Sequence, residues 1–316
     1  MIDVRTKREF SHSRIPSAIN LPIFSNSEFE KIGLLYKQNP LQANFLGASI
    51  ACRNIADILE NNKDILKHKF KILLYCARGG NRSLSLYQVL KSLKLQVSRL
   101  EGGYKAYRNA VIDFLNSPIK RDFLTLCGNT GCGKSELIEL NSTWGIDLEK
   151  LANHYGSSFG FISGTQPSVK MFENSLTNEL INKESSILLI ENESKKLGNI
   201  IIPNILYTAY QNSKKILITC DLECRIERTL KLYKDIKQDD FINTMQKISP
   251  YISKETKFEI LKSWDNGDKR RIAKLLLVKY YDKVYKQIDC DFKVDSTNLE
   301  LANKEIAEIK NKIESH

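Results

Sequence analysis

Hydrophobic residues in the first third of the chain gather in short, continuous runs, each followed by small or polar residues. The runs cover residues 18–22, 70–75 and 96–100. A short run that is apolar throughout is typical of a strand buried on both faces of a parallel sheet. Residues 83–93 instead carry apolar side chains at helical spacing, and residues 104–120 resemble a helix and linker. The pattern predicts a small α/β domain over residues 1–118.

The same alternation returns in the rest of the chain. Three further apolar runs cover residues 123–127, 186–190 and 215–220. We expect a helix over residues 135–140, and residues 222–286 are mostly helical in pattern. This arrangement predicts a second α/β domain over residues 119–316, with a parallel sheet and a helical C-terminal part. Ligands of such a sheet bind at the carboxyl ends of its strands.

The turn after the 70–75 run combines a cysteine with glycines and arginines. Its residues are Cys76, Ala77, Arg78, Gly79, Gly80, Asn81, Arg82 and Ser83. Backbone amides in such a turn, and the start of the helix that follows, attract an anion and lower the pKa of a thiol. Cys76 is therefore a candidate nucleophile, and the loop from Arg78 to Ser83 is a candidate cradle for an anionic donor.

The turn after the 123–127 run has the spacing of a phosphate-binding loop. Its residues fit the pattern G-x4-G-K-[ST]: Gly128, Asn129, Thr130, Gly131, Cys132, Gly133, Lys134 and Ser135. In this pattern the amides cradle a diphosphate, the lysine contacts its outer oxygens, and the hydroxyl ligates Mg²⁺. Glu191, which follows the 186–190 run, and Glu193 are candidate acidic residues beside such a metal. The sequence assigns no complete set of metal ligands.

Charge and composition narrow the class of protein. The formal charge of this 316-residue chain is +11, from 48 Lys+Arg against 37 Asp+Glu, which suits a polyanionic partner, although the lysines are spread along the chain. No apolar run is long enough to span a membrane, and the first residues have no apolar signal core. The seven cysteines do not form a disulfide framework. We therefore expect a cytoplasmic protein without a membrane partner.

The order of motifs resembles known families. Asp3-Val4-Arg5, residues 15–22, the Cys76 loop and Glu101-Gly102-Gly103 resemble the rhodanese (sulfurtransferase) domain. A rhodanese-like domain followed by a phosphate-binding loop resembles the tRNA 2-selenouridine synthase family, over about residues 2–287. Further matching motifs are Asp147-Leu148-Glu149, His154, residues 156–160, Phe172-Glu173-Asn174, Arg225-Ile226-Glu227-Arg228, Tyr280-Tyr281-Asp282 and Tyr285.

The resemblance implies a reaction at the wobble uridine of tRNA. Members of this family convert 2-thiouridine to 2-selenouridine through an S-geranyl-2-thiouridine intermediate, and they use geranyl diphosphate and selenophosphate as substrates. Carried over to this chain, the resemblance assigns selenation to Cys76 and the diphosphate site to residues 128–135. It also implies tRNA as a partner and an enzyme that supplies selenophosphate. Mg²⁺ is a candidate cofactor because Ser135 of the phosphate-binding loop could ligate it.

Three departures from the family pattern bear on these expectations. The family usually has a helix and a strand before Asp-Val-Arg, whereas this chain has only Met1-Ile2, which predicts a looser first domain or a misplaced start. Asn192 replaces an aspartate, which leaves Glu191 and Glu193 as the acidic candidates. Arg82 follows Cys76 by six positions rather than five, a spacing also seen in cysteine phosphatases.

The residues alone leave two other functions open. One is a P-loop kinase or NTPase fused to a rhodanese-like or cysteine-phosphatase-like module. The other is a tRNA-binding protein in which both loops are idle, although nothing structural requires Arg82 or Lys134 at these positions.

Overall fold

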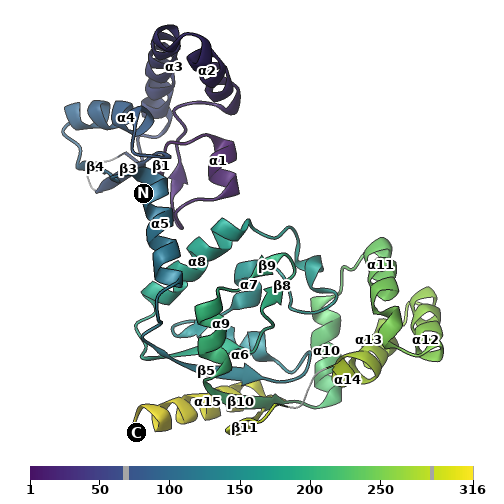
Figure 1. Cartoon of the computed structure of the whole chain (residues 1–316). Coiled ribbons are helices and arrows are strands. Elements are labelled where there is room, and N and C mark those ends of the chain that lie inside the picture. The colour runs from purple at the N-terminus through teal and green to yellow at the C-terminus, as the bar shows by residue number, and fades with distance from the viewer. Residues whose placement is uncertain (67–70, 285–287, 316) are drawn as a thin grey trace. The chain divides into compact units, whose positions relative to one another are not determined.

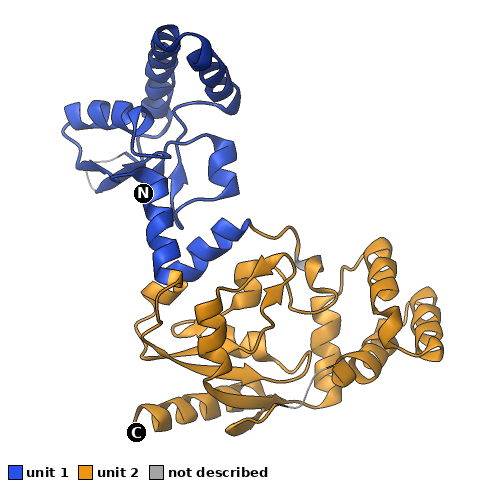
Figure 2. Ribbon diagram, in the orientation of Figure 1, with its two compact units in different colours: residues 1–114, 168–178 blue, residues 115–167, 179–316 orange. Residues whose placement is uncertain are grey.

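The computed structural model describes residues 1–66, 71–284 and 288–315, apart from the side chains of residues 162 and 163. Phe70, at the start of the predicted 70–75 strand, and Tyr285 lie outside the described residues. The chain forms two compact units: residues 1–114 with 168–178, and residues 115–167 with 179–316 (Figure 2). Residues 168–178 thus belong to the first unit, whereas the predicted division into residues 1–118 and 119–316 places them in the second domain.

The first unit is built on a parallel sheet with the strand order β2-β1-β3-β4. Its strands are β1 (Ile2–Asp3), β2 (Ile19–Asn20), β3 (Ile72–Tyr75) and β4 (Val97–Arg99) (Figure 1). The expectation of a buried strand at residues 18–22 is wrong in one respect, because Ile19 is 45% exposed and burial begins only at Leu21. β2 lies at the edge of the sheet, where a strand has a neighbour on one side only.

Helices surround this sheet. They are α1 (Lys7–His12), α2 (Asn26–Gln38), α3 (Pro40–Asn61), α4 (Asn81–Ser92), α5 (Gly103–Leu115) and most of α8 (Val169–Asn182). α2 begins with a reciprocal capping box between Ser25 and Glu28, and Asn39 caps α3. The fully buried side chains of Leu74, Leu86 and others form the core between sheet and helices.

The Asp-Val-Arg motif stabilises the first unit. Arg5 forms an ion pair with Asp3 at 2.6 Å and donates to the Ser13 carbonyl at 2.7 Å. Its guanidinium lies 3.9 Å from the centroid of the Tyr104 ring. The Asn20 amide donates to the carbonyls of residues 3 and 5, both at 2.9 Å, which ties β2 to β1. Because Asp3 and Arg5 are buried, each neutralises the other, so the motif has a structural role.

The Phe-Glu-Asn motif on α8 is also structural. The Asn174 amide donates to the Tyr104 hydroxyl at 2.8 Å and to the Arg14 carbonyl at 2.7 Å. Glu173 forms an ion pair with Arg108 of α5. These contacts attach the first eleven residues of this helical segment, 168–178, to the first unit.

The second unit contains a five-stranded parallel sheet with the order β11-β10-β5-β7-β6. The strands are β5 (Asp122–Cys127), β6 (Gly145–Ile146), β7 (Ile187–Glu191), β10 (Lys214–Thr219) and β11 (Phe292–Asp295). A separate antiparallel pair consists of β8 (Lys196–Leu197) and β9 (Ile200–Ile201). β5 lies between β7 and β10, so the strand that ends in Glu191 directly adjoins the strand that leads into the phosphate-binding loop.

Two groups of helices accompany this sheet. Those packed near the sheet are α6 (Lys134–Leu140), α7 (Leu148–Ala152), α9 (Asn204–Gln211) and α15 (Leu299–Glu314). A helical group comprises α10 (Leu222–Leu232), α11 (Gln238–Ile248), α12 (Lys254–Asp265), α13 (Lys269–Leu276) and α14 (Asp282–Val284). It also contains short 3₁₀ helices at Gly160–Ser163 and Ser249–Tyr251 and a π-helical segment at Leu277–Tyr281.

This architecture confirms the predicted fold class, two parallel-sheet α/β parts with a helical C-terminal part. Within the ranges that the structure describes, no helix is both long and apolar enough to cross a membrane.

Candidate functional site

Cys76 directly follows β3, and its side chain is buried near the start of α4. Its Sγ lies 3.3 Å from the Ser83 hydroxyl and 3.8 Å from the Gly80 carbonyl oxygen. Burial by itself raises the pKa of the Cys76 thiol. Hydrogen bonds from the side chain and backbone of Ser83 and from the backbone of Arg78, together with the charge of Arg82, outweigh burial and lower that pKa. The loop therefore favours a thiolate, the nucleophilic form.

The two arginines of this loop have different surroundings. Arg82 forms an ion pair with Glu9 at 2.7 Å, and its guanidinium lies 4.6 Å from the Phe29 ring centroid. Glu9 thus offsets part of the positive charge of Arg82. Arg78 is exposed at the loop surface. Arg78 is therefore the more accessible cation for an anionic donor.

The Glu-Gly-Gly motif shapes the thiol loop. Gly103 has a φ of +59°, and a Cβ at this position would lie 2.3 Å from the Cys76 carbonyl oxygen. The next two amides, of Tyr104 and Lys105, donate to the carbonyls of Cys76 and Ala77 at 2.8 and 2.9 Å. The start of α5 can approach the loop backbone this closely only because glycine occupies position 103.

The phosphate-binding loop follows β5. Gly128 has a φ of +150°, and a Cβ there would lie 2.4 Å from the Ile218 carbonyl oxygen of β10. Glycine therefore lets the loop pass directly over the neighbouring strand. The Lys134 ammonium donates to the Gly128 carbonyl at 2.9 Å, so the lysine side chain lies along the loop.

Side chains from distant parts of the sequence support this loop. Arg225 of α10 binds both carboxylate oxygens of Asp282, at 2.6 and 3.0 Å, and donates to the Thr130 carbonyl at 3.0 Å. The Asn129 amide donates to the same carboxylate at 2.9 Å. Arg225 and Asp282 lie in motifs that match the family, although the sequence assigned no role to either residue. Their contacts indicate that they position the loop.

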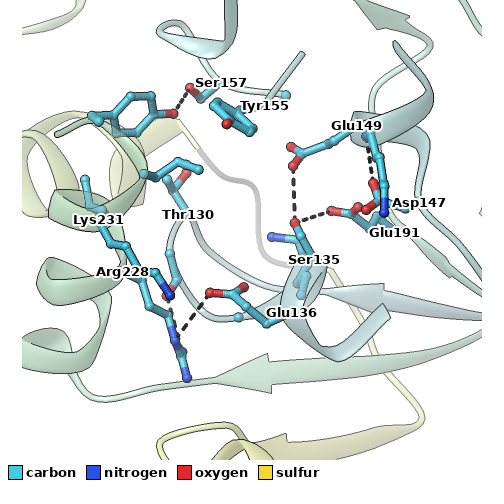
Figure 3. A pocket seen from close by; sticks show the side chains of 18 of the residues that line it. Thr130, Ser135, Glu136, Asp147, Glu149, Tyr155, Ser157, Glu191, Arg228 and Lys231 are labelled. Carbon is cyan, nitrogen blue, oxygen red and sulfur yellow. Dashed lines mark hydrogen bonds and ion pairs between the residues drawn. The ribbon is translucent and has the colours of Figure 1, made fainter. Parts of the chain in front are cut away.

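A cavity of about 710 Å³ opens at this loop. This volume is typical of small-molecule sites. Arg228 and Lys231 of α10 lie on one side of it, and Glu149 and Glu191 lie on the other (Figure 3). Basic groups at one wall suit an anionic ligand, and carboxylates at the other suit a cation.

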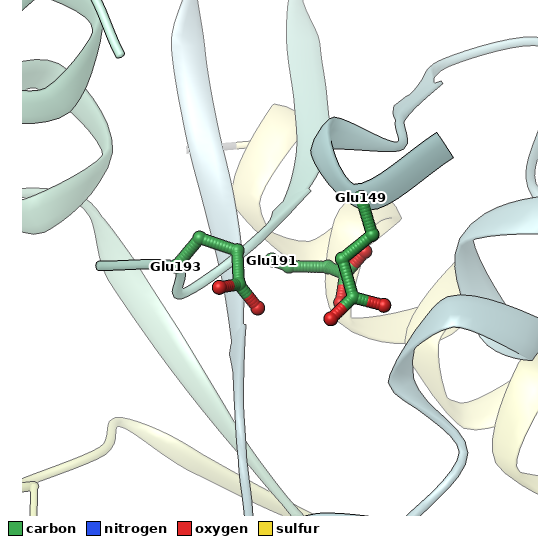
Figure 4. A group of neighbouring side chains, drawn as sticks. All are labelled: Glu149, Glu191 and Glu193. Atoms are coloured by element: carbon green, nitrogen blue, oxygen red, sulfur yellow. The ribbon is translucent and has the colours of Figure 1, made fainter. Parts of the chain in front are cut away.

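Three glutamates meet beside Ser135. Glu149 comes from α7, Glu191 is the last residue of β7, and Glu193 follows two positions later (Figure 4). One carboxylate oxygen from each lies within 4.8 Å of the others. The Ser135 hydroxyl contacts the carboxylates of Glu149 and Glu191 at 3.2 and 3.4 Å. The Oε1 atom of Glu191 is buried and has no hydrogen-bond partner among the described residues.

Burial raises the pKa of each of these carboxyl groups, and the charge of neighbouring carboxylates adds to the rise. The pKa of Glu149 rises to about 8, first through burial and then through the charge of Glu193. The pKa of Glu191, also buried, rises well above its ordinary value, although the charge of Lys134 opposes the rise. Crowded carboxylates of this kind ionise together only when a cation neutralises them. Three carboxylates and a hydroxyl provide the oxygen ligands that Mg²⁺ prefers, so these residues fit that ion.

The structure thus gathers the predicted residues in two places. The loop from Cys76 to Ser83 surrounds the buried thiol, and the loop from Gly128 to Ser135 opens into the cavity with Glu191 and Glu193. Glu149 was not among the acidic candidates from sequence, although it lies in the matching Asp-Leu-Glu motif. Arg228, which lines the cavity, was likewise without a predicted role.

The chain is similar to known proteins over nearly its whole length. Residues 1–110 match the rhodanese-like domain, and residues 121–257 match the tRNA 2-selenouridine synthase AAA domain. A tRNA 2-selenouridine synthase of Shewanella denitrificans is 33% identical over 307 residues, which cover 95% of this chain and 83% of the relative. The chain belongs to the tRNA 2-selenouridine synthase family. The predicted resemblance is confirmed.

Two more members of the tRNA 2-selenouridine synthase family show similar identity to this chain over different lengths. That of Shewanella halifaxensis is 31% identical over 339 residues, covering 93% of this chain and 90% of the relative. That of Alcanivorax borkumensis is 36% identical over 242 residues, covering 74% and 66%. The rhodanese-like match contains the Cys76 loop, and the AAA match contains the phosphate-binding loop with all three glutamates.

Proposed function

We propose that this chain modifies tRNA by converting 2-thiouridine at the wobble position to 2-selenouridine, as a selenium transferase. The observation that carries the proposal is the match over 95% of the chain to a relative named tRNA 2-selenouridine synthase. Two features of the loops support it. The first loop favours the thiolate form of Cys76, and the second loop opens into a cavity.

The first proposed step is geranyl transfer at the phosphate-binding loop. The sulfur of 2-thiouridine forms a bond to C1 of geranyl diphosphate while the C1–O bond breaks and diphosphate leaves with the bonding electrons. The loop amides, Lys134 and Arg228 stabilise the negative charge that develops on the leaving group. Ser135 with Glu149, Glu191 and Glu193 would hold Mg²⁺, which supplies positive charge to a diphosphate when bound.

The second proposed step is selenation, for which Cys76 is required. Selenium from selenophosphate bonds to C2 of the base, the C2–S bond breaks, and geranylthiol leaves. Water then bonds to the phosphorus of the donor, the P–Se bond breaks, and phosphate is released. Arg78 and the loop amides hold the donor anion close to the Cys76 thiolate. An enzyme that forms selenophosphate would supply this donor.

The proposed tRNA partner agrees with the charge of the chain. The excess of 48 basic over 37 acidic residues gives the +11 that favours a polyanion.

Mass spectrometry of tRNA nucleosides tests the proposal. Incubation of purified chain and 2-thiouridine tRNA with geranyl diphosphate alone is expected to yield S-geranyl-2-thiouridine. Addition of selenophosphate is expected to convert this nucleoside to 2-selenouridine. Absence of both products with a folded chain would contradict the proposal.

A second candidate function is nucleotide hydrolysis by a P-loop kinase or NTPase fused to a rhodanese-like or cysteine-phosphatase-like module. This function is favoured because the strand that leads into the complete loop at residues 128–135 pairs with the strand that ends in Glu191. Steady ATP hydrolysis that is independent of tRNA would support this function over geranyl transfer.

A further inference from the structure

A second, apolar cavity lies in the helical group of the second unit. It measures about 60 Å³, and its walls include Phe159, Phe241, Trp264 and Leu276. The rings of Phe241 and Trp264 stack with centroids 3.9 Å apart and an interplanar angle of 9°, which makes one wall flat and firmly packed. Such a wall suits a hydrocarbon group.

This apolar pocket adjoins the phosphate-binding cavity. Thr229, in the last turn of α10, and Tyr233, directly after this helix, line both cavities. Thr229 lies against the loop, because a Cβ on Gly131 would be 3.2 Å from its hydroxyl. The Tyr233 ring lies 5.9 Å from the Phe159 ring of the apolar pocket, and its hydroxyl is 2.8 Å from that of Ser157. A single turn of helix therefore leads from the loop to the apolar pocket.

The two cavities have opposite chemistry. The larger one contains the loop amides, Lys134 and Arg228, which suit a diphosphate. The smaller one is enclosed mainly by aliphatic and aromatic side chains, which would leave the polar edge of a nucleotide base without partners. A ligand with a diphosphate head and a hydrocarbon tail satisfies both at once.

We propose that the apolar pocket binds the distal end of the tail of a prenyl diphosphate whose head lies on the phosphate-binding loop. This inference rests on the proposed function, which places geranyl diphosphate at that loop. One water molecule needs a cavity of about 10–15 Å³. The apolar pocket, at about 60 Å³, therefore has room for a few waters or for one branched five-carbon unit. The pocket thus acts as a ruler that accepts a ten-carbon chain and excludes a longer one.

Two substitutions change the pocket in opposite directions. Ala273→Leu adds volume at a buried wall position and is expected to plug the pocket, and Leu276→Ala is expected to enlarge it. Both residues lie on α13. A gain in binding of a longer chain by Leu276→Ala cannot arise from misfolding, so the pair separates a specific role from general damage.

The experiment measures dissociation constants of the full chain for inorganic diphosphate, geranyl diphosphate and farnesyl diphosphate. The wild-type chain is expected to bind geranyl diphosphate at least tenfold more tightly than inorganic diphosphate. Ala273→Leu is expected to weaken geranyl diphosphate about tenfold and leave inorganic diphosphate unchanged. Leu276→Ala is expected to improve farnesyl relative to geranyl diphosphate about tenfold.

The outcomes separate this inference from the proposed function. If the wild-type chain prefers geranyl over inorganic diphosphate but both variants keep the wild-type ratios, the pocket assignment is overturned and the proposed function stands. If the wild-type chain shows no such preference, the pocket assignment is overturned, and the nucleoside products described above decide the proposed function separately. Thermal unfolding of each variant confirms that the chain compared is folded.

Discussion

The thiol loop after β3 and the phosphate-binding loop after β5 share one local design, a parallel strand that turns through glycines into a helix. Their neighbours differ. Hydrogen-bond donors surround Cys76 and lower its pKa, so this loop favours a negative charge of its own. Three carboxyl groups, two of them buried and that of Glu149 half-buried, lie near Ser135 and their pKa values are raised, so this second site favours a bound cation. The backbone of a loop thus provides the cradle, and the residues packed around it decide which charge the site accepts.

The largest expected effect separates the two loops by reaction step. Cys76→Ser is expected to reduce selenation more than about a thousandfold, because a serine hydroxyl stays protonated where the thiol ionises. Geranyl transfer should persist at the wild-type level. Nucleoside mass spectrometry measures both products, and Cys52→Ser, at an exposed cysteine, is the matched control. Undiminished selenouridine in Cys76→Ser would remove Cys76 from the reaction.

The reverse separation comes from the phosphate-binding loop. Lys134→Ala is expected to lower kcat/KM for geranyl diphosphate about a hundredfold, because the leaving diphosphate loses a positive charge beside it. Selenation of tRNA that already carries the geranyl group should continue. Lys304→Ala, at an exposed lysine of α15, controls for the loss of a charge. Equal loss of both steps would indicate that the two loops do not have separate roles.

The next effect concerns the carboxyl cluster. The pKa of Glu149 is raised from 4.5 to about 8, so its protonated form is favoured by folding. Its contribution to stability is complete below pH 4.5 and is lost as pH rises through about 8. Thermal unfolding without Mg²⁺ should show this decline, and Glu193→Gln should reduce it, because the charge of Glu193 helps to raise the Glu149 pKa.

Mg²⁺ provides the control for that measurement. Because the ion binds ionised carboxylates, it should raise the unfolding temperature of the wild-type chain at pH 8 and have little effect on Glu191→Gln. A wild-type stability that is flat from pH 5 to 8 and insensitive to Mg²⁺ would contradict both the raised pKa values and the fitted metal site.

The smallest effect is a change in the ionisation of the thiol. The rate at which iodoacetamide alkylates Cys76 should reach half its maximum at a lower pH than the rate for an unstructured cysteine peptide, because the folded loop lowers the thiol pKa. Ser83→Ala removes the hydroxyl 3.3 Å from Sγ and should shift the midpoint upward. Mass spectrometry of the Cys76 peptide follows the reaction. An identical midpoint in both chains would show that Ser83 does not support the thiolate.

Much of the fold was predictable because its strands are apolar and short. The 123–127 and 215–220 runs correspond to β5 and β10 within a residue or so. The hydrophobic pattern does not single out α2, which has no buried residue, or β6 and β11, which have two and four residues. Ile19 also shows the limit of a pattern, because only the position of β2 at the sheet edge explains its exposure.

The two loops could be recognised in the sequence, because each is a contiguous segment whose residue order sets its backbone and its local donors. The family could also be recognised there, through the order of motifs along the chain. The charge that each site favours depends on contacts between distant segments, which appear only in the folded chain. Folding pairs Arg82 with Glu9, 73 residues away, and it brings Glu191 to Ser135 across 56 residues. The physical reason is that pKa values and ion pairs depend on distances of a few ångströms, which the packing of sheet and helices sets.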